Sequence, residues 1–215
     1  MIAGPRFGLI VFDFDGTLSD SGHWFLSIVD DLAERFRFRR VDADEIETLR
    51  NRTTREVIDH LGIPSWKLPI IARHVRARFA RNTDQIHLFD GVRDMLRTLS
   101  EAGIRLMICT SNAEDNVRAI LGETDAARIE RFYCGSGLFG KTRKFRRLVK
   151  NAGAPRETIL TIGDETRDID AARAVGIPCG AVLWGYANRD VLVATGPDFT
   201  FDSPGDIIRK LIGGG

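Results

Sequence analysis

Short, continuously apolar runs alternate with amphipathic helical patterns along most of this chain. The runs lie at residues 8–13, 104–109, 158–162 and 177–183, with weaker ones at 132–134 and 199–201. Helical periodicity separates or follows them, at residues 92–102, 113–121, 141–151, 166–175 and 204–212. Strands that are apolar on both faces belong to parallel sheets that helices cover on both sides. The pattern therefore predicts an α/β fold, a Rossmann-like parallel sheet core flanked by helices.

One segment, residues 20–86, breaks the alternation. It shows no clear strand, only amphipathic helical patterns at residues 24–36, 44–51, 54–61 and 69–81. A run of helices between two α/β parts is typical of an insertion. We therefore expect two domains, an α/β core made of residues 1–19 and 87–215 and an inserted helical domain made of residues 20–86.

Charge and composition exclude several classes of protein. The chain carries 31 Lys and Arg against 30 Asp and Glu, a net charge of +1, whereas nucleic-acid-binding domains are usually strongly basic. No stretch of eighteen apolar residues is present, and the first residues lack the pattern of a signal peptide. Three cysteines are too few for a disulfide framework. We expect a cytoplasmic monomer or homodimer with no nucleic-acid or membrane partner.

The first polar motif, Asp13-Phe14-Asp15-Gly16-Thr17, directly follows the first apolar run. Residues i and i+2 of an extended segment face the same side, so Asp13 and Asp15 would start out aimed in one direction before Gly16 turns the chain. Two carboxylates about 4 Å apart repel each other by about 4 kcal/mol at an effective dielectric constant of about 20. A proton, a cation or full solvation must offset this repulsion. Thr17 is expected to cap the loop or to steady Asp15.

A second polar group, Thr110-Ser111-Asn112, lies between the run at 104–109 and the next helix. A hydroxyl group and free backbone N–H groups at a helix N-terminus form an anion site, although the same residues are also common as simple N-caps.

Two further groups begin helices. Lys141 stands at the head of a helix, where a cation opposes the helix dipole unless it reaches an anion, and Lys144 is the alternative that stays in solvent. Asp164 and Asp168 follow the run at 158–162. With Asp13 and Asp15 they would form an oxygen-rich site suited to Mg²⁺. Asp168 alone also fits an acidic residue in the first turn of a helix.

In this order the motifs resemble those of the haloacid dehalogenase-like hydrolase superfamily, over essentially the whole chain. The matching residues are the Asp13–Thr17 run, Thr110, Lys141, and Gly163-Asp164 followed by Asp168. The insert at 20–86 looks like the small helical cap of the subgroup that includes phosphoglycolate phosphatases and β-phosphoglucomutases. The later run Trp184-Gly185-Tyr186 is similar to the phosphoglycolate phosphatase branch.

The resemblance implies a role for each matching carboxylate. Asp13 would be the nucleophile that forms an aspartyl phosphate, and Asp15 would protonate the leaving oxygen and then activate water. Mg²⁺ would be held by Asp13, by the backbone carbonyl of Asp15 and by Asp164. Asp168 would bind the ion directly or orient its ligands.

The resemblance also implies how the transferred group is held. Thr110 and the N–H groups of Ser111 and Asn112 would bind the phosphoryl oxygens, and Lys141 would neutralise the charge that develops there. The implied activity is Mg²⁺-dependent hydrolysis of a small phosphorylated metabolite such as phosphoglycolate. Asp15 favours this reaction over dehalogenation, since a leaving halide needs no proton.

Other functions use similar residues. A phosphomutase would form the same aspartyl phosphate and return the phosphoryl group to its substrate. A non-catalytic binding module would be expected to lack Asp13, Asp15 or Asp164, and all three are present. A receiver-type signalling domain normally lacks a helical insert and the DxDGT run.

Substrate selection is expected to depend on the insert. His23, Trp24, Trp66 and Arg73 are candidates by position and character, although His23 and Trp24 also fit packing at a hinge. Basic side chains gather on the last helical pattern of the insert, where they form a solvated face or a rim that attracts an anion. They are Arg73, Arg76, Arg78 and Arg81.

Overall fold

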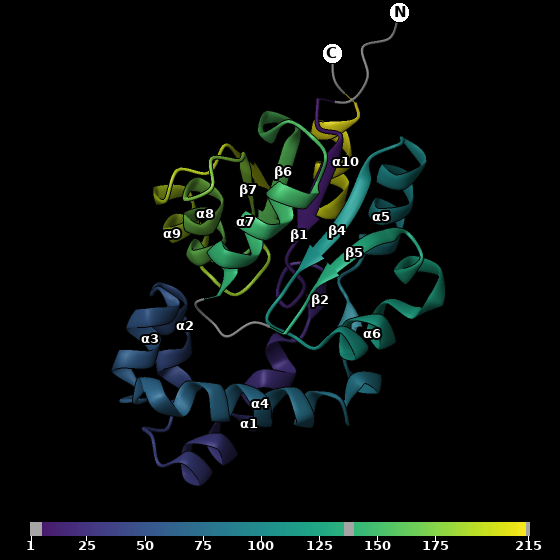
Figure 1. Cartoon of the computed structure of the whole chain (residues 1–215). Coiled ribbons are helices and arrows are strands. Elements are labelled where there is room, and N and C mark those ends of the chain that lie inside the picture. The colour runs from purple at the N-terminus through teal and green to yellow at the C-terminus, as the bar shows by residue number, and fades with distance from the viewer. Residues whose placement is uncertain (1–5, 136–139, 214–215) are drawn as a thin grey trace, which may run out of the picture.

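The computed structural model describes residues 6–135 and 140–213 and contains a six-stranded parallel sheet (Figure 1). The strands lie in the order β5-β4-β1-β6-β7-β8. Their bounds are β1 Leu9–Phe12, β4 Arg105–Cys109, β5 Ile129–Tyr133, β6 Ile159–Gly163, β7 Cys179–Val182 and β8 Phe199–Phe201. In the centre, Phe12 pairs with Ile108 on one side and with Ile162 on the other. The carboxyl ends of β1, β4 and β6 therefore lie level with one another.

Helices cover both faces of this sheet. Their bounds are α5 Val92–Glu101, α6 Glu114–Ala126, α7 Lys141–Asn151, α8 Thr166–Arg173, α9 Arg189–Ala194 and α10 Pro204–Leu211. On one face Ile10 and Phe12 join a core that includes α5, α6 and α10, and on the other Leu9 and Val11 join a core that includes α7 and α8. Burial on both faces explains why the central strands read as continuous apolar runs. The predicted fold class is confirmed.

Between the ribbon strands β2 (Ser19–Asp20) and β3 (His87–Leu88) the chain forms helices only. These are α1 Gly22–Phe36, α2 Ile46–Arg50, α3 Thr54–His60 and α4 Leu68–Phe79, with short 3-10 turns at Ala43–Glu45, Ser65–Lys67 and Thr83–Gln85. We call residues 20–86 the helical segment. It lies beyond the carboxyl ends of the central strands (Figure 1). Trp24 of α1 packs edge-on against Phe79 of α4, with ring centroids 4.8 Å apart, and both rings belong to the same hydrophobic cluster as Phe12 of β1.

Several elements differ from the sequence-based prediction. Strand β5 begins at Ile129 rather than at residue 132, because Glu130 and Arg131 are exposed on this edge strand and interrupt the apolar run. Helix α6 continues past residue 121, across a break at Gly122, where φ is +76°. The six-residue helix α9 and the two-residue strands of the β2–β3 ribbon are too short to give a periodic signal. No helix among the described residues combines the length and apolar character that a membrane span requires.

Packing on the sheet gives a stability prediction. Leu99 of α5 is completely buried against the sheet, so Leu99→Ala is expected to lower the free energy of unfolding by about 2–5 kcal/mol. Arg97→Ala, two residues away, removes only a half-exposed side chain in an exposed ion pair with Asp94 and is expected to change stability by less than about 0.5 kcal/mol. Urea denaturation measures the free energy of unfolding of both variants, and an equal decrease in the two would contradict this packing.

Candidate active site

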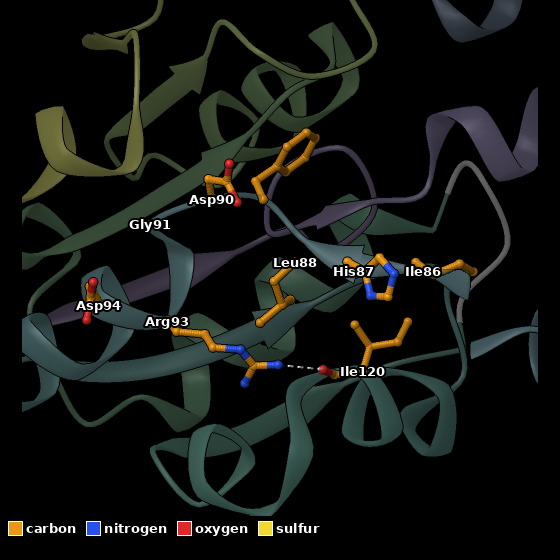
Figure 2. A pocket seen from close by; sticks show the side chains of 9 residues that line it. Ile86, His87, Leu88, Asp90, Gly91, Arg93, Asp94 and Ile120 are labelled. Carbon is orange, nitrogen blue, oxygen red and sulfur yellow. Dashed lines mark hydrogen bonds between the residues drawn. The ribbon is translucent and has the colours of Figure 1, made fainter. Parts of the chain in front are cut away.

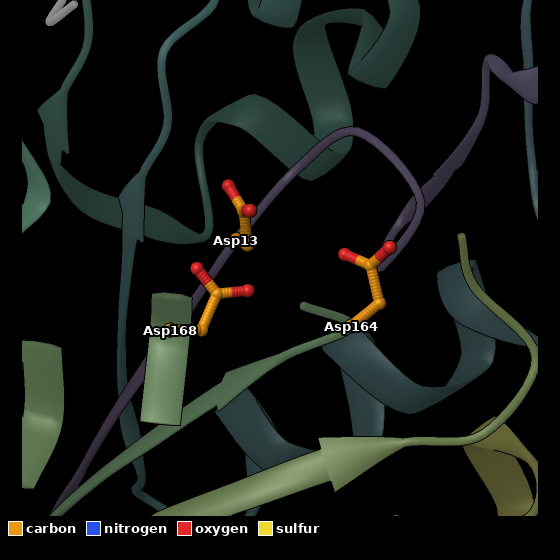
Figure 3. A group of neighbouring side chains, drawn as sticks. All are labelled: Asp13, Asp164 and Asp168. Atoms are coloured by element: carbon orange, nitrogen blue, oxygen red, sulfur yellow. The ribbon is translucent and has the colours of Figure 1, made fainter. Parts of the chain in front are cut away.

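Three buried aspartates meet at the carboxyl end of the sheet. Asp13 follows β1, Asp164 follows β6, and Asp168 lies in the first turn of α8. One oxygen from each carboxylate lies within 4.8 Å of the other two. Figure 3 shows the three carboxylates around one shared space. Several carboxylate oxygens around one centre are the donor set that Mg²⁺ prefers, so these residues fit a magnesium ion.

Lys141 supplies positive charge to this cluster. As the first residue of α7 its side chain is buried, and Nζ lies 2.7 Å from Asp13 Oδ2 and also donates a hydrogen bond to Asp168 Oδ1. Although burial disfavours the ammonium form, the Asp13 and Asp168 carboxylates raise the pKa of Lys141 above its usual value. Lys141 therefore reaches anions, which is the case in which a cation at the start of a helix is not costly.

Two cations, Lys141 and Arg167, act on these carboxylates but do not balance them, because Arg167 is paired with Glu165. Burial raises the pKa of Asp13, where the Lys141 ammonium opposes the shift and the Asp168 carboxylate adds to it. Burial also raises the pKa of Asp164 well above its usual value, and the charges of Glu165, Asp168 and Asp13 add to this effect. The site thus lacks positive charge, which is a second reason why a divalent cation fits it.

Asp15 has its own partners. It accepts hydrogen bonds from Ser21 Oγ at 2.9 Å and from Asn112 Nδ2 at 3.1 Å, and Ser21 Oγ lies 2.7 Å from the Tyr186 hydroxyl. Burial, followed by the charge of Asp13, raises the pKa of Asp15 to about 7. The Asp15 side chain is not among the three converging carboxylates, so only its backbone carbonyl stays a predicted metal ligand.

The loop that follows β4 is closed by its own side chains. Thr110 Oγ1 accepts the N–H of Asn112 at 3.1 Å, and Asn112 Oδ1 accepts the N–H of Ala113 at 2.8 Å. Asn112 also reaches Asp15, which joins this loop to the first motif. Of the two N–H groups predicted to be free for an anion, those of Ser111 and Asn112, the Asn112 N–H therefore has an internal partner, which an incoming phosphoryl group would have to replace.

Lys144 is not the solvated residue that the sequence predicts. Its Nζ donates to the carbonyl of Thr110 at 2.8 Å and to the carbonyl of Tyr133 at 2.7 Å, and the side chain is half-buried. These bonds attach α7 to the ends of β4 and β5. The correction has a geometric cause, because one helical turn beyond Lys141 still faces the same sheet edge.

Asp164 is held by hydrogen bonds that the sequence does not predict. Thr17 Oγ1 donates to Asp164 Oδ1 at 2.8 Å, and the backbone N–H of Tyr186 donates to Asp164 Oδ2 at 2.8 Å. Both expectations for Thr17, a loop cap or support of Asp15, are therefore wrong. Trp184 Nε1 in turn donates to the Thr17 carbonyl at 3.1 Å. Because Thr17 and Tyr186 are far from Asp164 in sequence, only the order of the strands reveals these contacts.

Asp168 performs two structural tasks at once. Its Oδ2 accepts the N–H of Glu165 at 3.2 Å, which caps the start of α8, while its Oδ1 contacts Lys141. Gly163 makes room for this carboxylate, since a Cβ atom at that position would lie 2.2 Å from Asp168 Oδ2. Asp168 is therefore both an acidic residue in the first turn of a helix, the alternative that the sequence left open, and one of the three clustered aspartates.

Two hollows adjoin these elements. Neither is lined by Asp13, Asp164 or Asp168. The smaller, of about 480 Å³, is lined by residues 86–91, 93, 94 and 120 and includes no residue that contacts the clustered aspartates (Figure 2). The larger, of about 730 Å³, is lined by Asp15, Ser111, Asn112 and Arg167 of the core and by residues of all four helices of the helical segment. The larger cavity is therefore the candidate substrate site.

The helical segment contributes unequally to that cavity. Arg76 lines it and donates to the carbonyl of Ser111 at 3.4 Å, whereas Arg78 pairs with Asp31 at 2.7 Å. Arg73 and Arg81 are exposed outside the lining, as is Trp66. His23 and Trp24 line the cavity, although Trp24 also packs against Phe79 as expected for a hinge.

Comparisons with known proteins identify relatives of this chain. Residues 10–182 match the family model described as haloacid dehalogenase-like hydrolase. A phosphoglycolate phosphatase from Synechococcus elongatus is 31% identical over 203 residues, which cover 94% of this chain and 96% of the relative. One from Pseudomonas syringae pv. syringae is 29% identical over 230 residues, which cover 100% of this chain and 82% of the relative.

Solved structures show the same fold. A haloacid dehalogenase-like hydrolase from Streptococcus pneumoniae has a TM-score of 0.78 at 20% identity, and the match covers 95% of this chain and 98% of that one. CbbY from Rhodobacter sphaeroides, solved in complex with phosphate, has a TM-score of 0.71 at 20% identity, covering 94% of this chain and 96% of that one. At this level of identity the likeness concerns the fold alone.

Close packing around Asp164 gives a second prediction. Gly16 has a φ of +79°, and a Cβ atom there would lie 2.2 Å from Asp164 Oδ2. Gly16→Ala is therefore expected to lower the free energy of unfolding by at least about 1 kcal/mol. Gly8→Ala is the matched control, because a Cβ atom there meets nothing within 4 Å, and it is expected to change stability by less than about 0.5 kcal/mol. Equal free energies of unfolding for the two variants, measured by urea denaturation, would contradict this close packing of Gly16 against Asp164.

Proposed function

The chain belongs to the haloacid dehalogenase-like hydrolase family and is a phosphatase, and on this premise we propose that it hydrolyses a small phosphomonoester in a Mg²⁺-dependent reaction through an aspartyl phosphate on Asp13. One observation carries the proposal. The Asp13 carboxylate, 2.7 Å from the Lys141 ammonium, shares one space with Asp164 and Asp168. A carboxylate that could act as the nucleophile, a cation and oxygen atoms that could hold a metal thus lie side by side, which supports the proposal.

Asp13, Asp164 and Asp168 would hold the metal, together with the backbone carbonyl of Asp15 that the family resemblance implies. When bound, Mg²⁺ neutralises the repulsion of about 4 kcal/mol that each close pair of phosphate and carboxylate charges would otherwise meet. Thr17 and the N–H of Tyr186 orient Asp164 toward this position. Their hydrogen bonds occupy lone pairs of the carboxylate and so limit its rotation.

In the first half-reaction, a carboxylate oxygen of Asp13 attacks phosphorus and the bond from phosphorus to the leaving oxygen breaks. The Asp15 carboxyl group gives its proton to that leaving oxygen, so an alcohol departs. Ser21 and Asn112 hold the Asp15 side chain in place for this transfer. Lys141 balances the negative charge beside Asp13.

In the second half-reaction, Asp15 takes a proton from water while the water oxygen attacks phosphorus. The bond between phosphorus and Asp13 breaks, which releases inorganic phosphate and restores both carboxyl groups. Thr110, Ser111 and Asn112 would bind the phosphoryl oxygens in both steps. The Asn112 N–H would then exchange its internal partner, Thr110 Oγ1, for the phosphoryl group.

We further propose that the helical segment acts as a cap over this centre. Arg76 reaches the carbonyl of Ser111, and Thr54 donates a hydrogen bond to Glu165 of the core. The relatives in Synechococcus and Pseudomonas are named for phosphoglycolate, which makes this compound the reference substrate. Its phosphoryl group would occupy the core side of the cavity, beside Asp15 and Asn112.

The nucleophile is tested by Asp13→Asn. An amide is a much weaker nucleophile than a carboxylate, so phosphomonoester turnover with Mg²⁺ is expected to fall by about 10³-fold or more. Asp94→Asn is the control, because its side chain is 74% exposed and pairs with Arg97 on the same helix, and it is expected to keep the parental rate. An Asp13→Asn enzyme as active as the parent would show that another residue attacks phosphorus.

Metal dependence is tested by chelation and by calorimetry. Excess EDTA is expected to abolish turnover, and Asp164→Asn is expected to weaken Mg²⁺ binding by about 10- to 100-fold, since one ligand loses its charge. Asp170→Asn serves as the matched control because its carboxylate lies in the same α8 region but is 68% exposed. Hydrolysis that persists in EDTA, or equal Mg²⁺ affinity in the two variants, would contradict the assignment.

A further inference from the structure

The candidate substrate cavity changes in character along its length. At the core end it is lined by Asp15, Ser111 and Asn112. Two lining arginines from the helical segment also point to this end, because Arg50 donates to the carbonyls of Gly185 and Tyr186 and Arg76 donates to that of Ser111. These polar groups match the phosphoryl end of a substrate.

The end within the helical segment is apolar. Side chains from all four helices line it, among them Trp24, Val29, Leu49, Val57, Ile71 and Val75. Phe25 and Leu26 line the same cavity and keep 42% and 39% of their surface exposed. Exposed aromatic and aliphatic groups around a hollow indicate a surface that gains by burying an apolar ligand.

The size of the cavity also exceeds the needs of phosphoglycolate. Beyond its phosphoryl group that compound has two carbons and a carboxylate, whereas a volume of about 730 Å³ lies within the range of about 300–1,000 Å³ that holds drug-sized ligands. A carboxylate against apolar walls would lose hydration without gaining hydrogen bonds. The apolar walls would therefore contribute little to binding such a short, charged substrate.

Resting on the proposed phosphatase function, we propose that the end of the cavity within the helical segment binds an apolar leaving group, so that the preferred substrates are phosphomonoesters of apolar alcohols larger than glycolate. The phosphoryl group lies at the core end and the carbon chain runs between α1, α2, α3 and α4. The competing occupant is the carboxylate of a short substrate, for which the Arg76 guanidinium is the candidate partner.

A series of n-alkyl phosphates tests this directly. Methyl, butyl, hexyl and octyl phosphate have similar leaving oxygens and differ mainly in apolar surface. With Mg²⁺ present, kcat/KM is expected to rise by up to about fourfold for each added methylene group that is buried. The rise in kcat/KM is expected to come from a lower KM and not from a higher kcat, because the alkyl chain binds equally in the ground and transition states. The kcat/KM for octyl phosphate is expected to exceed that for phosphoglycolate.

Two phenylalanine substitutions on α4 identify where the chain binds. Ala72 lines the cavity, so Ala72→Phe is expected to remove most of the advantage of octyl phosphate over methyl phosphate. Ala77 lies on the same helix, exposed and outside the lining, so Ala77→Phe is expected to keep that advantage. Turnover of methyl phosphate by both variants shows that they are folded.

Calorimetry separates failure of this inference from failure of the proposed activity. Alkylphosphonates have a carbon–phosphorus bond that the proposed reaction does not break, and their affinity is expected to increase with chain length, with an increasingly negative heat capacity change. If phosphonates bind in this way but no phosphomonoester is hydrolysed, the cavity assignment stands and the proposed activity fails. If phosphomonoesters are hydrolysed but neither kcat/KM nor phosphonate affinity depends on chain length, the inference is wrong. It is also wrong if the kcat/KM for phosphoglycolate exceeds that for every alkyl phosphate.

Discussion

Repulsion among buried carboxylates is the constraint on which this structure depends. Asp13, Asp164 and Asp168 lie within 4.8 Å of one another at a position that excludes most water, so their charges must be compensated locally. Lys141 provides part of the compensation, and Thr17 and the N–H of Tyr186 provide hydrogen bonds. The remaining deficit of positive charge is what a divalent cation would supply. Full compensation of the negative charge by the protein would stabilise the fold, but it would also leave the cluster with little affinity for a metal ion.

The parallel sheet is what brings these side chains together. Strand β1 lies between β4 and β6 in level register, so the loops after all three strands open at one edge. Helices α7 and α8 begin at that same edge and contribute Lys141 and Asp168 from their first turns. The helical segment leaves the sheet from the loop after β1 and returns before α5, which sets it above the cluster. A single topological arrangement therefore positions the proposed nucleophile Asp13, the Lys141 cation and the candidate substrate cavity.

The fold was predictable from sequence because both faces of the central strands are buried, which leaves continuous apolar runs such as residues 104–109. Edge strand β5 was less visible because exposed Glu130 and Arg131 interrupt it. Within the site, the convergence of Asp13, Asp164, Asp168 and Lys141 followed from their positions at strand ends and helix starts, although their catalytic roles stay predictions. The roles of Lys144 and Thr17 could not be foreseen, since both depend on contacts between strands and loops that no local pattern encodes.

The central claim is that Asp13 carries the phosphoryl group between two half-reactions. The most direct measurement stops the enzyme with acid during turnover of a phosphomonoester with Mg²⁺, reduces it with borohydride and maps its peptides by mass spectrometry. Borohydride converts an acyl phosphate of aspartate into homoserine, whereas a free carboxylate is not reduced. Homoserine at position 13 is the predicted result. Turnover that leaves Asp13 unmodified, or homoserine at another aspartate, would contradict the account.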